Sequence, residues 1–467
     1  VLFNSIEFAF FLLAVFLIYW FLTKGKLKVQ NTLLLAASFL FYGWWDYRFL
    51  SLIIFSSTLD YSIGLALGRK KTPSTRKLLL WASLLVNLGF LGVFKYYDFF
   101  VESFAEAFTF FGTPMDPGRL NIILPVGISF YTFQTLSYTI DVYRGKLQPS
   151  RDPIAFFAFV SFFPQLVAGP IERATNLLPQ FHRKRSFDQE KAIDGLRQVL
   201  WGLFKKIVIA DNCATYANQI FDDPTQYNSS TLVLGGIFFA FQIYGDFSGY
   251  SDIAIGTARL FGFDLKRNFA FPYFSRDIAE FWRRWHISLS TWFRDYLYIP
   301  LGGSRGSTAS KIRNVFIIFV VSGFWHGANW TFLAWGLWNR NRTHTDNVAQ
   351  GRLFPSLKEA GQILATFIIT VFAWVFFRAD SMGEAFVYLG GIFDPSLFSI
   401  PDIFPLHLIF ALLILLVVEW MQREKQHGLE LDRGKMPTYL RWGIYYGVVI
   451  AIALLGTGQQ TFIYFQF

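Results

Sequence analysis

Apolar stretches of roughly 17 to 25 residues recur from one end of this chain to the other, and that is the length a helix needs to cross a bilayer. The chain is 53% hydrophobic and only 16% charged, far from the balance of a soluble globular protein. The first stretch, Ile6–Leu22, has neither the basic flank nor the small-residue cleavage site of a secretory signal, so we expect it to remain as a span. The sequence therefore predicts an all-α, polytopic membrane protein in which residues 1–467 form a single membrane domain.

We expect roughly eleven membrane elements. The expected spans are Ile6–Leu22, Asn31–Trp45, Phe49–Leu67, Leu78–Phe94, Leu120–Ile140, Asp194–Ala217, Thr231–Tyr244, Val315–Trp338, Ile363–Phe377, Phe404–Met421 and Trp442–Leu455. A further apolar segment, Ile154–Ala168, is short, contains Pro164 and has cytoplasmic features on both flanks, which predicts a re-entrant or broken element. Lys205 and Lys206 fall in the middle of the expected helix Asp194–Ala217, so we expect it to cross near its interface or to lie tilted with these lysines snorkelling.

The basic residues lie in short clusters between the apolar stretches, which is the pattern that orients membrane proteins. This pattern accounts for the net charge of +10 without any binding of nucleic acid. One loop departs from this orientation pattern. If Val315–Trp338 runs outward, the basic loop Asn339–Arg352 falls on the outer side of the membrane, where basic loops are not expected. An apolar segment is missing after Trp338.

The sequence lacks the motifs of several common chemistries. Its single cysteine, Cys213, excludes an intramolecular disulfide framework and a cysteine-based zinc site. It contains no HExxH motif, no phosphate loop and no Gly-x-Ser-x-Gly elbow. We therefore expect no metal and no permanently bound cofactor.

Two of the six histidines are candidates for chemistry. His326 falls about 17 Å along an expected span, near the middle of a bilayer core of about 30 Å. A polar group at that depth marks catalysis or transport, or else a hydrogen-bonded packing histidine. His286 lies in a segment that alternates aromatic and cationic residues, which is typical of an interfacial anchor as well as of a site.

Imidazole suits proton abstraction from a hydroxyl, because it takes and returns a proton near neutral pH. Attack on a thioester carbonyl also requires a donor for the developing oxyanion, and Asn329, Trp325 or a nearby arginine could supply it. Asp246 and Asp252 lie in or beside an apolar segment. They either cap locally and pair with basic residues of the following segment, or shape a donor pocket.

Five motifs resemble those of the membrane-bound O-acyltransferases, in the branch of alginate O-acetyltransferase and of the teichoic acid D-alanylation membrane protein. These motifs are Asp246–Asp252, Glu280–Trp292, Arg294–Tyr298, Leu301–Gly303 and Phe324–Asn329. Weaker similarity extends over Phe41–Trp45, Leu124–Tyr131 and Val167–Pro170.

The resemblance implies an MBOAT-like ring of helices around a central tunnel, with a core at about residues 120–338. It implies that His326 is the essential histidine, that His286 is the second catalytic position, and that residues of the same motifs bind substrate. Those residues are Trp325, Asn329, Trp285, Arg283, Arg294, Asp295, Tyr298, Asp246 and Asp252.

The function expected from the resemblance is acetyl transfer from a cytoplasmic thioester donor, acetyl-CoA or another acyl thioester, across the bacterial inner membrane. The acceptor would be an alginate-like exopolysaccharide, reached through periplasmic acetyltransferase partner proteins, and membrane lipids would surround the chain. Two alternatives stay open: a polytopic transporter or channel, and a scaffold of an export complex with a non-catalytic histidine. A proton-coupled carrier should show several intramembrane carboxylates and inverted repeats, and the sequence indicates neither.

Overall fold

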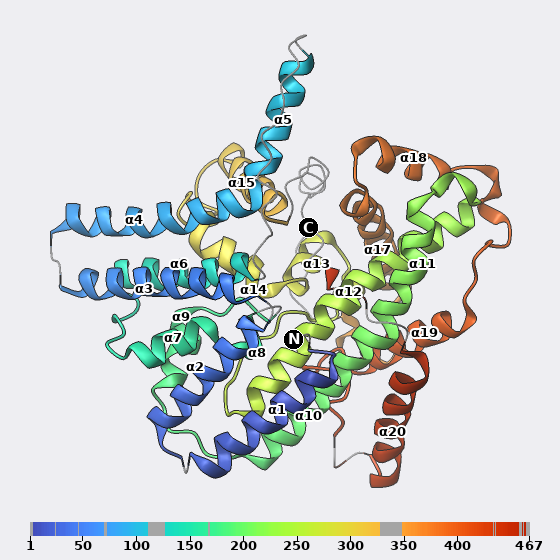
Figure 1. Ribbon diagram of the computed structural model, residues 1–467. Helices are drawn as coiled ribbons and strands as arrows, with labels where there is room; N and C mark the ends of the chain where they lie inside the picture. Colours follow the sequence, from blue (N-terminus) through green and yellow to red (C-terminus); the bar gives the residue numbers. More distant parts are fainter. Residues whose placement is uncertain are drawn as a thin grey trace. The chain divides into compact units, whose positions relative to one another are not determined.

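The computed structural model describes residues 3–23, 25–44, 46–69, 72–110, 127–166, 169–326, 348–432, 434, 436–456, 460, 462 and 463. Within these ranges every regular element is a helix, as the sequence predicts (Figure 1). The chain packs as two units: Val1–Ala192 with Thr257–Leu265, and Ile193–Gly256 with Lys266–Phe467. We describe each unit by itself.

Among its described residues, the first unit contains eight longer helices and several short helical turns. Its elements are α1 (Ile6–Leu17), η1 (Ile18–Leu22), α2 (Leu27–Gly43), α3 (Tyr47–Arg69), α4 (Pro73–Leu91), η2 (Gly92–Tyr96), α5 (Tyr97–Phe110), α6 (Ile128–Tyr143), α7 (Pro153–Ser161), α8 (Phe163–Leu166) and α9 (Ala174–Phe181). Helices α3, α4 and α6 pack together (Figure 1). At Gly64 a Cβ would lie 2.6 Å from the ring of Tyr138, so only glycine permits this approach of α3 to α6.

The predicted broken element is confirmed at α7 and α8. The helix stops at Phe162, just before Pro164, and resumes for one turn. The aromatic residues around the break are completely buried, so the irregular backbone is enclosed by protein. Two polar side chains satisfy its backbone groups: Ser38 accepts from the Phe163 N–H at 3.0 Å, and Gln134 donates to the Phe159 carbonyl at 2.7 Å.

The second unit surrounds most of the 32-residue helix α12 (Ser229–Leu260). Its other elements are α10 (Gln189–Leu203), which begins in the first unit, η3 (Phe204–Ala210), α11 (Asp211–Asp222), η4 (Pro224–Gln226), η5 (Pro272–Phe274), α13 (Ile278–Arg284), α14 (Ile287–Phe293), η6 (Arg294–Tyr298), α15 (Thr308–His326), η7 (Val348–Gly351), α17 (Leu357–Arg378), α18 (Met382–Ile392), η8 (Pro395–Phe398), α19 (Leu406–Met421) and α20 (Thr438–Leu455). The expected span Thr231–Tyr244 is therefore only the first half of a longer helix.

Five helices among the described residues are long and apolar enough to cross a membrane. They are Tyr47–Arg69, Pro73–Tyr96, Ser229–Leu260, Leu357–Arg378 and Thr438–Leu455. Shorter apolar helices occupy Ile6–Leu22, Pro153–Leu166 and Leu406–Met421. Parts of the expected spans Leu120–Ile140 and Val315–Trp338 lie outside the described residues.

Candidate active site

Helix α13 is fixed at its beginning and its end by a buried carboxylate. Glu280 accepts a hydrogen bond from Nε of Arg276 at 3.0 Å and another from Nη2 of Arg284 at 2.7 Å. Arg284 in turn donates to the carbonyl of Ala270 at 3.2 Å, and the Ala270 N–H donates to the Arg284 carbonyl at 2.9 Å. These bonds hold the segment before α13 against the segment after it, which brings Asn268 beside His286.

His286 is buried and precedes α14 in the left-handed region, with φ 42°. A non-glycine residue in this conformation is strained and is held there by its surroundings. The Ile287 N–H donates to the Asn268 carbonyl at 2.8 Å, and the edge of the Phe247 ring packs against the imidazole with centroids 4.6 Å apart. The imidazole is therefore held in one orientation.

Hydrogen bonds to Asn268 determine which imidazole nitrogen carries the proton. The Ser288 N–H, which can only donate, lies 3.2 Å from Asn268 Oδ1, and the Ser288 hydroxyl donates to the same atom at 2.8 Å. This oxygen is thus an acceptor, so His286 Nδ1, 3.1 Å away, donates to it when the ring is neutral. The resulting tautomer presents a lone pair at Nε2, as a general base requires.

Asn268 was missed by sequence reasoning. It is completely buried, and its Nδ2 donates to Ser251 Oγ at 3.1 Å. The one available signal was a lone amide just before the apolar run Phe269–Pro272. Because Asn268 and His286 are 18 positions apart, the sequence did not indicate that they form a hydrogen bond.

A cavity of about 220 Å³ opens beside His286, between α13, α14, η6 and α15. Its lining is largely apolar, with a few polar groups. The lining residues are Trp282, His286, Leu289, Ser290, Phe293, Arg294, Tyr298, Val315, Ile318 and Ser322. Sites for drug-sized ligands occupy roughly 300 to 1,000 Å³, so this cavity suits a small group.

The structure brings three predicted residues together at this cavity: His286, Arg294 and Tyr298. Arg294 and Tyr298 are the first and last residues of η6, a π-helical turn. Such turns occur frequently at functional sites. Asp295 accepts a hydrogen bond from Arg294 Nε at 2.8 Å, and the Tyr298 hydroxyl lies 3.0 Å from Ser304 Oγ.

Three other predicted residues do not line this cavity. Trp285 is completely buried in an aromatic cluster, stacked on Phe281 with centroids 5.5 Å apart. Arg283 is exposed, and Trp325 is buried near the end of α15. Trp285 therefore packs beside the histidine segment.

For His326 the structure describes the backbone, as the last residue of α15. Ser322, in the cavity wall, precedes it by one helical turn. Asn329 and the junction after Trp338, where the sequence predicts a missing apolar segment, lie outside the described residues.

Asp246 and Asp252 lie inside α12 and form ion pairs with two consecutive lysines that precede them. Lys206 Nζ lies 2.8 Å from Asp246 and 2.7 Å from Asp211, and Lys205 Nζ lies 2.6 Å from Asp252. Pairing was expected, but with the following segment, and that choice of partners was wrong. The expectation that the lysines snorkel was also wrong, because both side chains are at most 3% exposed.

The second unit thus holds several buried carboxylates within its apolar helices, contrary to the sequence reading. Glu419 of α19 adds another, accepting the Tyr244 hydroxyl at 2.8 Å. From the sequence, Asp246 and Asp252 could be placed only in or beside an apolar segment, because they fall after the apolar half of α12. In the described part of the chain, no group of three or more His, Cys, Asp or Glu side chains could hold a metal ion.

Comparisons with known proteins identify the family. The model of the membrane-bound O-acyltransferase family matches residues 150–340. A probable alginate O-acetylase of Azotobacter vinelandii is 40% identical over 409 residues, which cover 86% of this chain and 80% of the relative. One of Pseudomonas aeruginosa is 43% identical over 389 residues, 82% of this chain and 73% of the relative. This chain belongs to the membrane-bound O-acyltransferase family.

A peptidoglycan O-acetyltransferase of Helicobacter pylori is also similar, at 36% identity over 426 residues, 84% of this chain and 79% of the relative. The chain is therefore an O-acyltransferase, and its apolar helices make it a multi-pass membrane protein. As an acyltransferase it requires an acyl donor.

Proposed function

We propose that this acyltransferase takes an acetyl group from a cytoplasmic thioester, acetyl-CoA or another acyl thioester, and passes it across the bacterial inner membrane. The acceptor is an alginate-like exopolysaccharide, reached through a periplasmic partner protein. The similar proteins are described as acting on alginate and on peptidoglycan, which are both glycans. A single membrane domain, in which roughly eleven elements ring a tunnel, would give both sides access to one site.

The cavity beside His286 supports a short acyl group. Its volume of about 220 Å³ leaves room for an acetyl group and the sulfur that carries it, whereas a long lipid chain would need a longer channel. Its apolar walls also exclude water, which would otherwise hydrolyse the thioester. We assign Arg294 and Tyr298 to binding of the donor at this cavity.

The reaction requires a base and a group that receives the negative charge. A lone pair on histidine removes the proton from the attacking hydroxyl, and the hydroxyl oxygen bonds to the thioester carbonyl carbon. The carbonyl oxygen then carries the charge, and Asn329 or Trp325 donates to it. When the carbon–sulfur bond breaks, the imidazolium returns the proton to the departing thiolate.

We assign this base to His326, with His286 as the second catalytic histidine. The observation that carries the assignment is the environment of His286. Its Nδ1 proton is directed to Asn268, and its ring lines a small cavity whose opposite wall is α15, the helix that ends at His326. Asp295 orients Arg294, while Asp246 and Asp252 hold α12 in place.

The test is polysaccharide O-acetyl content in cells whose only copy carries His326→Ala or His286→Ala, with membrane abundance measured alongside. We expect each variant to lose at least about 100-fold in acetylation, the range for removal of a general base. His407→Ala is the matched control, because His407 is exposed at the start of α19. Retained acetylation at normal abundance would refute both assignments and favour a scaffold in an export complex.

Vesicles of opposite orientation test the direction of transfer. Labelled acetyl-CoA should acetylate polysaccharide when it meets the cytoplasmic face of inverted vesicles and the acceptor is enclosed. Equal labelling with donor supplied only to the other face would contradict the proposed direction.

A further inference from the structure

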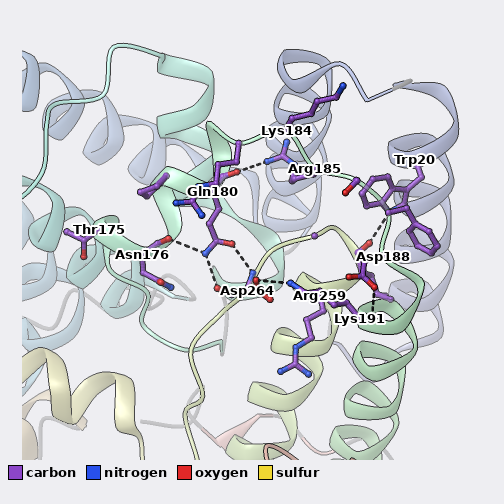
Figure 2. A pocket seen from close by; sticks show the side chains of 16 residues that line it. Trp20, Thr175, Asn176, Gln180, Lys184, Arg185, Asp188, Lys191, Arg259 and Asp264 are labelled. Carbon is purple, nitrogen blue, oxygen red and sulfur yellow. Dashed lines mark hydrogen bonds and ion pairs between the residues drawn. The ribbon is translucent and has the colours of Figure 1, made fainter. Parts of the chain in front are cut away.

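A second cavity, of about 510 Å³, lies wholly within the first unit (Figure 2). It is bordered by the end of η1, by α9, by the segment that leads from α9 into α10, and by the end of α12. Gln180 bridges its floor, because its side chain donates to the Asp264 carbonyl at 3.0 Å and accepts from the Asp264 N–H at 2.9 Å.

Five cationic side chains and only two carboxylates line this cavity. The cations are Arg183, Lys184, Arg185, Lys191 and Arg259, and the carboxylates are Asp188 and Asp264. In Figure 2, Lys184 and Arg185 approach it on one side of the Gln180–Asp264 bridge, and Lys191 and Arg259 approach it on the other. The cavity thus has an excess of three positive charges, which favours an anion.

Arg185 is the most buried cation in the lining, and its guanidinium lies over the Phe263 ring, 4.6 Å from the ring centroid. Only 6% of it is exposed, and it donates to two neutral oxygens, Asn31 Oδ1 at 2.6 Å and the Gln180 carbonyl at 3.3 Å. Its buried Nε lacks a hydrogen-bond partner among the described residues. A buried guanidinium stays charged, so an anion that reaches it would offset much of the cost of its burial.

Two exposed cations next to Arg185 in the sequence, Arg183 and Lys184, could also bind an anion. Across the residues that the structure describes, neither the Arg183 nor the Lys184 side chain has an ion pair or a hydrogen bond. By contrast, Lys191 is paired with Asp264 at 3.3 Å. Arg183 and Lys184 can therefore turn toward a ligand without breaking an existing contact.

The same cavity has an aromatic border next to an apolar helix face. Trp20 and Phe187 line it with ring centroids 5.4 Å apart, and Phe187 is half exposed. Preceding Trp20, the outer face of α1 exposes Phe10, Leu13 and Leu17. Tryptophan at the end of an apolar helix is typical of the headgroup level of a bilayer.

We propose that this cavity binds the phosphodiester head group of an anionic glycerophospholipid whose acyl chains lie along α1. The cationic residues neutralise the phosphate. Arg183 is suited to paired hydrogen bonds to its oxygens, and Nε of Arg185 to a single one. The exposed apolar residues of α1 cover the chains. A zwitterionic lipid carries no net charge and gains less from the cationic excess, so the site selects acidic lipids.

Native mass spectrometry of the full chain in neutral detergent tests this proposal. Phosphatidylglycerol and phosphatidylcholine with identical acyl chains are added in turn, and retained lipid is counted. We expect phosphatidylglycerol to be retained about tenfold better, equivalent to about 1.4 kcal/mol. The double variant Arg183→Gln/Lys184→Gln should lose most of that preference, and both side chains are exposed, so the fold should persist.

The matched control is Lys26→Gln/Lys28→Gln, which removes the same charge from exposed positions that do not line the cavity. Equal loss of preference in both double variants would overturn the proposal, because it would show charge attraction without a site. Displacement of the lipid by millimolar glycerol phosphate or inorganic phosphate would also overturn it, in favour of a small-anion site. The lipid-retention experiment does not depend on acetyl transfer, so its outcome is independent of the proposed function.

Discussion

Replacing Asn268 by alanine tests whether this residue controls His286. The substitution removes the acceptor of the imidazole Nδ1–H, of the Ser288 N–H and of the Ser288 hydroxyl. A buried donor without a partner costs roughly 1–3 kcal/mol, so the stability of the histidine segment should fall. More importantly, the proton of His286 is no longer directed to Nδ1, so this second catalytic histidine is present in the other tautomer for part of the time.

We expect Asn268→Ala to lower kcat by about 10- to 100-fold, which corresponds to roughly 1.4–2.8 kcal/mol. KM for acetyl-CoA should change little, because Asn268 does not line the cavity beside His286. The assay is the initial rate of acetyl incorporation into polysaccharide by membrane vesicles, divided by the amount of inserted protein. Ser251→Ala is the control, because it removes the partner of Asn268 Nδ2 and leaves the Oδ1 contacts intact.

Asn268→Asp separates positioning from mere structural support. Aspartate retains an oxygen acceptor for His286, so the variant should keep more activity than Asn268→Ala. Its negative charge also stabilises the protonated imidazole of His286, so a higher pH is needed to deprotonate this ring. The acid limb of the pH–rate profile therefore moves to higher pH. An unchanged profile, or an alanine variant with normal activity per inserted molecule, would refute the role of Asn268.

Three further substitutions test the packing of the chain. Lys206→Met leaves two buried aspartates without their cation and should lower the free energy of unfolding in detergent by roughly 3–5 kcal/mol. Lys191→Met removes an exposed ion pair and should lower it by about 0–1 kcal/mol. Equal losses of stability would contradict the buried network. Gly202→Ala places a Cβ 2.6 Å from the carbonyl of the facing helix and should lower the midpoint of unfolding. Gly89→Ala places its Cβ in open space and should leave the midpoint unchanged. Equal midpoints for the two variants would show that the helices can separate to make room for the Cβ. Burial raises the pKa of Glu280, but hydrogen bonds from two arginines outweigh this effect and lower the pKa below 4.5. The carboxylate therefore contributes stability above pH 4.5, and this contribution is lost as the pH falls through the pKa of the folded state. Glu280→Gln should flatten the acid side of the plot of unfolding free energy against pH.

Most of the helical framework could be predicted from the sequence, because burial in lipid requires long apolar stretches. The span predicted at Ile6–Leu22 coincides with α1 and η1, and Phe404–Met421 differs from α19 by two residues. The break near Pro164 was also predictable, since proline cannot continue the backbone ladder. These features depend on local composition alone.

The continuation of α12 beyond Tyr244 could not be predicted in the same way. Asp246 and Asp252 interrupt the apolar pattern and resemble the start of a loop. They are compatible with a buried helix only because Lys205 and Lys206 face them from about 40 residues earlier in the chain. A hydropathy pattern does not indicate which lysine and aspartate form an ion pair.

The catalytic part of the prediction was limited in a similar way. His286 could be selected from its motif, but its useful tautomer depends on an amide from outside that motif. Arg294 and Tyr298 line the cavity from a turn that is wound as a π-helix. Hydrogen-bond direction and helix winding at such sites are tertiary effects.

The buried charges of α12 also bear on the position of His286. Asp246 is fixed by Lys206 and also accepts the N–H of Ile463 at 2.6 Å, and the next residue, Phe247, packs its ring against His286. Rotation of α12 about its axis would therefore both break an ion pair in an apolar interior and withdraw the ring from the imidazole. The cost of separating a buried pair is several kcal/mol, larger than that of a packing contact alone. We infer that the ion pairs are retained because they fix the face that α12 presents to the histidine.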